Sequence, residues 1–298
     1  MNRWIWSSGK VIVAMSIVGS SVVAGKLVVQ SFPIFLANEL RFLVAAIILI
    51  PLWIKIEGFS TLNRKELVAI FLQALLGVFL FNLLMLHGLS KTTAMEAGII
   101  TGTLPVCTAF LSYFILKEKL TRNMGISILL AVVGAILMNI ANHSNTNHYS
   151  TSLLGNLFIL GAVFCESLFI IIGKLISYRM SALTVSTMVS LFGVILFFPF
   201  AVAESRYFEF KEISVAEWGL VLYFGIVVTV IAFLLMQQGL AVISASWAGV
   251  LTSLLPISSM ILSSILLDEK ITNLLQVCGF FLIIAAIYLL SKQQGIQN

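Results

Sequence analysis

Long apolar stretches separated by short polar segments recur along the whole chain. Each stretch is about 20 residues long, the length that an α-helix needs to cross the hydrocarbon core of a bilayer. A transmembrane β-barrel would instead show segments of about ten residues with alternating polarity. The pattern therefore predicts an all-α integral membrane protein with ten transmembrane helices. The predicted helices cover residues 10–29, 34–54, 67–86, 94–116, 123–141, 153–173, 182–203, 217–236, 245–267 and 274–291.

One part of this pattern occurs twice. The segments GTLPVCTAFLSYFILKEKLT (Gly102–Thr121) and SLLPISSMILSSILLDEKIT (Ser253–Thr272) both carry a proline in an apolar run and end on Glu-Lys-x-Thr. With the sequence shifted by 151 residues, 17 of 39 positions are identical between residues 83–121 and 234–272. Each predicted unit holds five helices, so the second unit enters the membrane with the opposite orientation. We therefore predict two inverted five-helix repeats, residues 1–142 and 153–298, an architecture that many secondary transporters use.

The charges of the two copies agree with this inversion. Lys117 in the first copy is replaced by Asp268 in the second, so the predicted outer copy carries less positive charge. Cytoplasmic loops are enriched in Lys and Arg. The shared threonine is predicted to cap the helix that follows, with the glutamate nearby as its partner.

Composition fits lipid as the solvent. The chain is 60% hydrophobic and 10% charged, with a mean hydropathy of +1.10, whereas soluble domains carry about 25% charged residues. With the N-terminus in the cytoplasm, eleven of the 17 Lys and Arg residues lie inside and four outside. The net charge of +5 is then explained by membrane orientation, and no nucleic-acid partner is indicated. A multi-pass protein of the cell membrane with both termini cytoplasmic is expected.

A cleaved signal peptide is the alternative for the first 25 residues. The apolar run continues past Lys26 without a clear small-residue cleavage site, so we favour a retained first helix. Cys107, Cys165 and Cys278 all fall within predicted helices, where they are interpreted as small core residues rather than as a disulfide set or a metal site.

Small residues form a stripe on one face of the fourth predicted helix, and the ninth repeats it. The stripe begins at Ala94 and Gly98 in the first copy and at Ala245 and Gly249 in the second. Two interpretations of the stripe stay open. Small residues allow close packing of helices. The stripe can also line a cavity, because the prolines leave carbonyl groups that need other hydrogen-bond partners. The candidates for lining a cavity, from these and other helices, are Ser20, Ser21, Gln73, Asn82, Thr101, Pro105, Trp247, Thr252 and Pro256.

The paired motifs resemble a known family. GSSVVAGKLVV (Gly19–Val29), LANELRFLVAAIIL (Leu36–Leu49) and the two Pro…Glu-Lys-x-Thr segments are similar to EamA-type transporters of the drug/metabolite transporter superfamily. The resemblance covers nearly the whole chain and implies a carrier of small polar metabolites, often outward, by alternating access. Many members carry a tryptophan before the Gly-Ser-Ser, and this chain has Val18 there.

Ionisable residues within membrane helices are costly and point to function. Glu166 is the first candidate, because it lies in the middle of the sixth predicted helix between apolar residues. Such surroundings favour the uncharged carboxyl, which suits a proton carrier or a cation ligand. A buried, hydrogen-bonded structural acid is the alternative.

Four further charges are candidates for substrate contact or ion coupling. Arg41 can hold a substrate carboxylate, pair with Glu39, Glu96 or Glu166, or contact lipid head groups. Glu39 lies in the outer part of the second helix, and Glu96 at the start of the fourth, where a carboxylate is favourable without any function. Lys26 lies near the outer end of the first helix and can extend to the membrane surface.

The predicted function is secondary transport of small polar organic metabolites, amino-acid- or nucleoside-like, in the export direction, with protons as a candidate coupling ion. Efflux of lipophilic cations is the alternative within the same class. No nucleotide-binding motif is present, and the three histidines lack HExxH spacing. No cofactor or metal is expected, and an intramembrane enzyme or a scaffold is the alternative from another class. The cargo and the oligomeric state are not indicated by the sequence.

Overall fold

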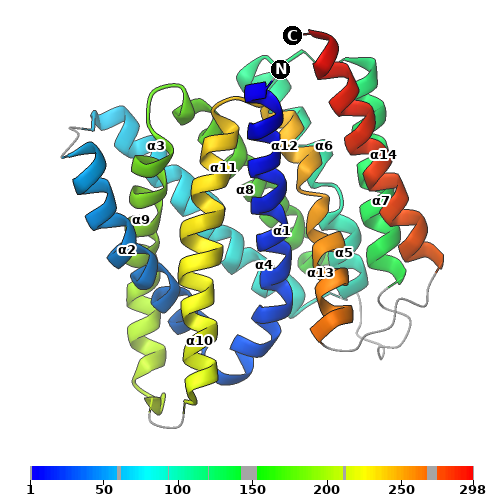
Figure 1. Ribbon diagram of the computed structural model, residues 1–298. Coiled ribbons are helices and arrows are strands. Elements are labelled where there is room, and N and C mark those ends of the chain that lie inside the picture. The colour runs from blue at the N-terminus through cyan, green and yellow to red at the C-terminus, as the bar shows by residue number, and fades with distance from the viewer. Residues whose placement is uncertain are drawn as a thin grey trace.

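The computed structural model is a bundle of long helices (Figure 1). It describes residues 2–58, 62–92, 94–119, 121–141, 153–210, 213–266 and 274–297, and these ranges contain no strand. Within them, seven segments are long and apolar enough to cross a membrane, and two shorter apolar helices cover Arg122–Met138 and Leu274–Leu289. The seven segments are Ile34–Glu57, Arg64–Leu89, Ala97–Leu116, Leu153–Ser177, Ala182–Ser205, Val215–Leu240 and Ala245–Leu262.

The all-α prediction is confirmed, and each predicted helix lies on helical segments over its described residues. Three of the helices contain a π-helical stretch, marked η. In chain order the elements are α1 (Asn2–Ser31), α2 (Ile34–Glu57), α3 (Arg64–Ala74), η1 (Leu75–Leu80), α4 (Phe81–Leu89), α5 (Ala94–Thr101), α6 (Leu104–Leu111), η2 (Ser112–Leu116), α7 (Arg122–Ala141), α8 (Leu153–Ser177), α9 (Ala182–Ser205), α10 (Val215–Tyr223), η4 (Phe224–Ile231), α11 (Ala232–Leu240), α12 (Ala245–Leu251), α13 (Leu254–Leu266) and α14 (Leu274–Gln297).

Both chain termini lie at one end of the bundle, at the top of Figure 1. We call this end the terminal face and the opposite end the far face. The start of α1 lies beside the end of α11, because a Cβ atom at Gly239 would meet Val11 and the carbonyl of Ser7. The end of α8 reaches the same place, where Lys174 contacts Leu240. Helices α1 and α8 are therefore antiparallel.

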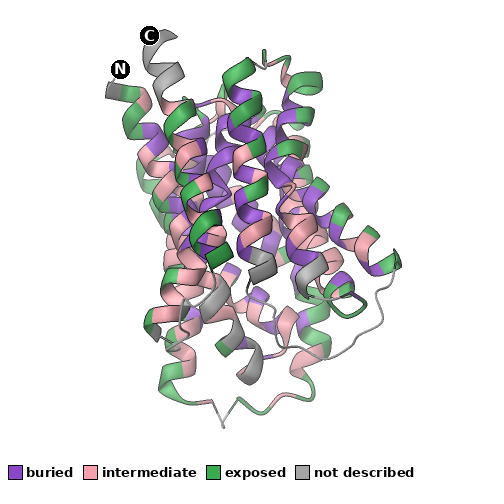
Figure 2. Ribbon diagram, turned by 90° about the vertical axis from the view of Figure 1, so that its right-hand side faces the viewer, coloured by how far each residue is buried: buried purple, intermediate pink, exposed green. Residues whose placement is uncertain are grey.

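Helices α1 and α8 pack against corresponding helices of the two predicted repeats. Helix α1 packs against α11 and α13, while α8 packs against α4 and α6. Helix α2 lies against α9, and α7 against α14. Buried residues gather toward the terminal face, whereas partly buried residues are more frequent toward the far face (Figure 2).

Two helices are interrupted beside a proline. The break between α5 and α6 lies at Gly102 and Thr103, two residues before Pro105, and the break between α12 and α13 lies at Thr252 and Ser253, before Pro256. A proline has no N–H to donate to the carbonyl four residues earlier, so the regular hydrogen-bond ladder ends there. Discontinuous helices of this kind often lie beside the binding sites of transporters.

Among the described residues, two of the close helix contacts at glycines would bring an added Cβ atom within 2.7 Å of a backbone carbonyl oxygen. Gly134 of α7 faces Gly279 of α14, and a Cβ atom on either would lie 2.7 Å or 2.6 Å from the carbonyl oxygen of the other. Gly19 of α1 lies against α13, where an added Cβ would be 2.7 Å from the Leu255 carbonyl oxygen and would overlap Ser258.

Replacing Gly19 with alanine is expected to destabilise the protein by about 1–3 kcal/mol, because the added methyl group must push α1 away from α13. Gly125→Ala is the matched control, since a Cβ there meets nothing within 4 Å. The control is expected to leave stability unchanged or raise it by up to about 1 kcal/mol. Thermal unfolding of the purified protein in detergent measures both, and equal transition temperatures would contradict the close approach.

Candidate functional site

Glu166 lies halfway along α8 and faces the interior of the bundle. The outer side of α8 is marked by Leu157 and Phe164, which are 54% and 46% exposed. At 100° per residue, Glu166 is about 180° and 200° away from them around the helix. Its own face carries Phe169 and Gly173, three and seven residues later. Glu166 is half-buried and is turned away from the exposed side of α8.

The neighbours of this face confirm that it is internal. A Cβ atom at Gly77 of η1 would overlap the ring of Phe169, which also lies 5.9 Å from the ring of Phe233 in α11. One turn on, a Cβ at Gly173 would meet the side-chain amides of Gln73 in α3 and Gln237 in α11. Helix α8 is therefore enclosed on this side by segments from both parts of the chain.

Glu39 is a second carboxylate inside the bundle. Its side chain is only 4% exposed, and neither carboxylate oxygen has a hydrogen-bond partner among the described residues. The spacing along α2 puts Glu39 on the same face as Phe35 and Phe42, four residues before it and three after it. A buried, unpartnered carboxyl is costly and therefore suggests a functional role.

Seven phenylalanines connect the helices that carry the two carboxylates. Their ring centroids lie 5.1–6.4 Å apart in a continuous chain through α2, η1, α8, α9 and α11. Glu39 and Glu166 each precede a member of this aromatic cluster by three residues, on the side nearer the far face. The members of the cluster are Phe35, Phe42, Phe79, Phe169, Phe197, Phe200 and Phe233.

Arg41 contacts an aromatic ring rather than a carboxylate. Its guanidinium carbon lies 4.6 Å from the ring centroid of Phe42, and its buried Nε has no hydrogen-bond partner in the part of the chain that the structure describes. Arg41 and Glu39 are two residues apart on α2 and project to nearly opposite sides. The ion pair of Arg41 with Glu39 or Glu166, one of the sequence-based alternatives, is thus not formed. The side chains of Lys26 and Glu96 lie outside the described residues.

Comparison with known proteins gives the family. The EamA-like transporter family matches residues 6–140 and again residues 153–292. The protein named "Uncharacterized transporter YetK" of Bacillus subtilis (strain 168) is 43% identical over 257 residues, which cover 86% of this chain and 78% of that protein. The chain belongs to the EamA-like transporter family.

More distant relatives agree with this assignment. "Uncharacterized transporter YyaM" of the same organism is 26% identical over 75% of this chain and 73% of its own length. One solved crystal structure superposes with a TM-score of 0.80 over 96% of both chains at 16% identity, which shows a shared fold. This EamA-like chain is thus a multi-pass membrane transporter, with a small molecule as substrate and the bilayer as its surroundings.

The candidates for cavity lining in this EamA-like transporter differ in burial. Gln73 is fully buried and donates from Nε2 to the Phe169 carbonyl at 3.2 Å, while its Oε1 has no partner within the described ranges. The hydroxyl of Ser20 reaches across to that of Tyr223 in α10. The buried candidates are Gln73, Pro105, Trp247 and Thr252, and the half-buried ones are Ser20, Ser21, Asn82, Thr101 and Pro256.

The small-residue stripes pack together in part. A Cβ atom at Gly249 of α12 would lie 2.8 Å from the Cβ of Thr108 in α6, and Thr108 is fully buried. The packing interpretation is therefore confirmed where α6 crosses α12. Among the cysteines, Cys107 is half-buried and Cys165 is buried, but Cys278 is exposed on α14, so its interpretation as a core residue is wrong. The described residues hold no group of His, Cys, Asp or Glu suited to a metal ion.

Sequence reasoning missed the role of Glu118. Its carboxylate accepts hydrogen bonds from the backbone N–H groups of Ala245 and Ser246 at 2.8 Å and 3.1 Å, and from the Ser246 hydroxyl at 2.7 Å. The Ser246 hydroxyl also contacts that of Ser112. We call these four residues the Glu118 clasp. It ties the segment after η2 to the first turn of α12, where a negative charge is favourable.

Lys174 holds the other side of the same turn. Its ammonium group is buried and donates to the carbonyl of Leu240, the last residue of α11, at 2.8 Å. Lysines near the ends of membrane helices often extend to the membrane surface, but Lys174 is turned into the bundle instead. The turn between α11 and α12 is held by a cation at the end of one helix and an anion at the start of the next.

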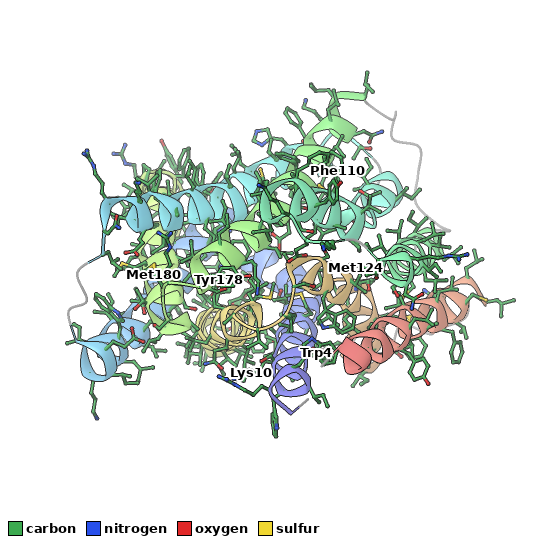
Figure 3. The ribbon with its side chains drawn as sticks, turned by 90° about the horizontal axis from the view of Figure 1, so that it is seen from above. Trp4, Lys10, Phe110, Met124, Tyr178 and Met180 are labelled. Atoms are coloured by element: carbon green, nitrogen blue, oxygen red, sulfur yellow. The ribbon has the colours of Figure 1, made fainter. Side chains whose placement is uncertain are left out.

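A tryptophan pair closes the terminal face next to the Glu118 clasp. Trp247 is 1% exposed, stacks on Trp4 of α1 with ring centroids 5.7 Å apart, and donates from Nε1 to the Ser8 hydroxyl at 2.9 Å. Figure 3, seen from this end, shows Trp4 pointing inward beside α14. Trp247 thus contributes to closure rather than lining an open space.

Proposed function

We propose that this chain is a secondary transporter that moves small polar organic metabolites, amino-acid- or nucleoside-like, out of the cell by alternating access. It has ten transmembrane helices in two inverted five-helix repeats, residues 1–142 and 153–298, with both termini in the cytoplasm. The equivalent packing of the antiparallel helices α1 and α8 supports the inversion, as does the double match of the family.

The position of Glu166 is the main observation that supports the proposal. A half-buried carboxyl group in the middle of a membrane helix, turned away from the exposed side of that helix, is placed to exchange a proton for substrate. Glu39 and the aromatic cluster adjoin the same interior region. The described neighbours give neither carboxylate a cationic partner, so both are available to a proton or to a ligand.

The closed terminal face supports a cycle with two alternating openings. The Glu118 clasp and the Trp4–Trp247 pair link helices at the terminal face, which we propose is cytoplasmic, while partly buried residues are more frequent toward the far face (Figure 2). Opening of the clasp on the cytoplasmic side, with closure at the far face, completes the cycle. Residues 267–273, the corresponding segment of the second repeat, lie outside the described residues.

Efflux of lipophilic cations is the second candidate. Two carboxyl groups beside seven phenylalanine rings favour a positively charged cargo, because aromatic faces attract cations. Arg41 disfavours a cationic cargo, because its positively charged guanidinium already lies against the ring of Phe42. The fixed charge of Arg41 is the reason that polar, zwitterionic metabolites remain the first proposal.

Reconstitution into liposomes tests the function. We expect one solute class among amino acids, nucleosides and organic cations to accumulate when a pH gradient is applied. A gradient of one pH unit is about 1.4 kcal/mol per proton, enough for about tenfold accumulation when one proton is exchanged. Uptake of labelled solutes with and without the gradient measures this.

Protein-free liposomes and a gradient collapsed by a protonophore are the controls. Accumulation of organic cations alone would select the second candidate. Solute movement no faster than in protein-free liposomes, across all three classes, would contradict the transporter proposal.

A further inference from the structure

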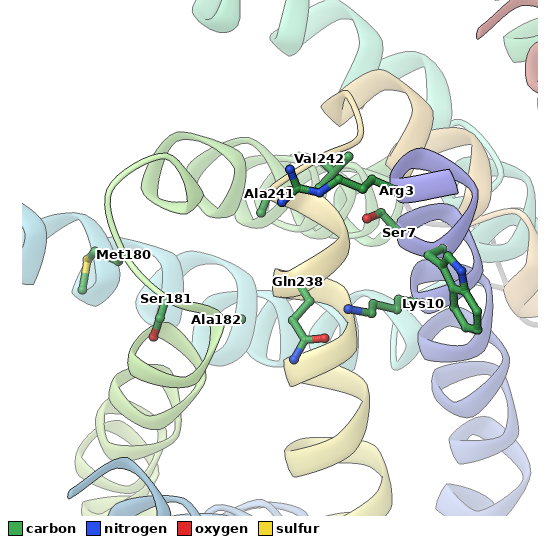
Figure 4. A pocket seen from close by; sticks show the side chains of 10 residues that line it. Arg3, Ser7, Lys10, Met180, Ser181, Ala182, Gln238, Ala241 and Val242 are labelled. Atoms are coloured by element: carbon green, nitrogen blue, oxygen red, sulfur yellow. The ribbon is translucent and has the colours of Figure 1, made fainter. Parts of the chain in front are cut away.

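A separate pocket opens at the terminal face, away from the two carboxylates. It has a volume of about 450 Å³ and lies between the start of α1, the end of α11 and the turn from α8 to α9. Arg3, Lys10, Ser181 and Gln238 supply its polar lining. In Figure 4, Arg3 and Lys10 extend from α1 toward α11, while Ser181 lies on the opposite side. We call it the basic pocket.

The residues that line the basic pocket carry a net positive charge. Arg3 and Lys10 are seven residues apart on α1 and so share one face of the helix. No acidic residue lines the pocket, and neither cation forms an ion pair with any residue described. Glu57 approaches its rim, where it accepts hydrogen bonds from Ser181 and Thr184 at 2.6 Å and 2.5 Å.

The donors in the pocket suit a phosphate group. A guanidinium binds phosphate oxygens as a planar fork, and a lysine ammonium adds a compact charge. The amide of Gln238 is exposed and offers neutral donors.

The depth of the pocket suits the polar border of a membrane. Trp6, which lines it, is 74% exposed, and Tyr178 at the nearby end of α8 is 68% exposed. Exposed Trp and Tyr side chains are typical of the level of lipid head groups. Basic pockets between helices at this level bind anionic head groups. The apolar part of the lining, including Trp6, can cover the uncharged portion of such a molecule.

From this geometry we propose that the basic pocket binds a phosphate-bearing anion, supplied by a lipid head group or by a free phosphate ester. Lys10 belongs to the first matched stretch, Arg3 lies three residues before it, and Gln238 belongs to the second. A bound anion therefore joins the two parts of the chain at the terminal face. This binding does not depend on the transport proposed above.

The test compares the full-length protein with the double variant Arg3→Gln/Lys10→Gln. The matched control is Lys55→Gln/Arg64→Gln, which removes two basic side chains at the end of α2 and the start of α3, outside the pocket. Both variants are first checked for unchanged thermal unfolding without ligand. Phosphatidylglycerol and phosphatidylcholine are then compared by native mass spectrometry of protein released from nanodiscs. In detergent, the protection against thermal unfolding given by glycerol 3-phosphate is compared with that given by chloride at equal ionic strength.

Retention of phosphatidylglycerol by the parent and the control, with at least tenfold weaker retention by the pocket variant, supports a lipid head group. Protection against unfolding by glycerol 3-phosphate that is lost only in the pocket variant supports a free ester. Equal losses in both double variants would show attraction by general charge and overturn the proposal. The proposal would also be overturned if the pocket variant bound both ligands with the same strength as the parent.

Discussion

Glu166→Gln is expected to abolish accumulation driven by a pH gradient. Glutamine keeps the size and polarity of the side chain but cannot take up or release a proton. The roughly tenfold accumulation that one proton supplies per pH unit should therefore fall to the level of simple equilibration. Labelled-solute uptake into proteoliposomes measures the loss, with the same amount of protein reconstituted in each case.

The matched control is Glu209→Gln, which removes an exposed carboxylate between α9 and α10. It should transport like the parent. Because Glu166 is only half-buried and has no hydrogen-bond or ion-pair partner to lose among the described residues, its variant should unfold at a temperature close to that of the parent. Proton-driven accumulation that persists unchanged in Glu166→Gln would remove this residue from the coupling mechanism.

Glu118→Ala is expected to open the terminal face. The substitution removes three hydrogen bonds to the first turn of α12, and hydrogen bonds to a charged group contribute about 1.5–3 kcal/mol each. Loss of even one such contribution changes the ratio of closed to open molecules by about tenfold or more. The change should be visible as new access to residues behind the clasp, and as reduced net transport.

A cysteine at Ser112 reports this access, because Ser112 is fully buried behind Ser246. The three native cysteines are first replaced by alanine, and a membrane-impermeant thiol reagent is added at the terminal face. We expect Ser112→Cys to be protected in the parent background and labelled at least about ten times faster with Glu118→Ala. Glu66→Ala, which removes a carboxylate from the capping box of α3, is the matched control. Equal labelling rates in the two variants would contradict a closing role for Glu118.

The helices could be predicted because the membrane imposes long apolar segments, and these dominate the pattern. The breaks at Gly102 and Thr252 were not predicted, because the helices 94–116 and 245–267 were expected to be continuous. The prolines that follow explain the breaks, since proline ends the hydrogen-bond ladder. The sequence also ranked Glu166 first, because a charge at mid-helix is rare and visible without any structure. Its orientation away from Leu157 and Phe164 follows from helical spacing once those residues are known to be exposed.

Other features depend on partners distant in the chain, and no local pattern shows them. Glu118 reaches a helix that begins 127 residues later, so its motif suggested only a local helix cap. Local spacing does support part of that prediction, because Thr121 accepts from Met124 N–H at 3.3 Å. Lys174 lies near a helix end, where lysines usually extend to water, and only the position of Leu240 explains its burial. Glu39 has ordinary apolar neighbours in sequence, and the aromatic cluster beside it forms from five separate segments.

The contact between Gly134 and Gly279 has a mechanical consequence. The two backbones approach each other there without intervening side chains, so we expect α7 and α14 to move together as one unit at an edge of the bundle. In the proposed transport cycle, we therefore expect the remaining helices to move relative to this pair.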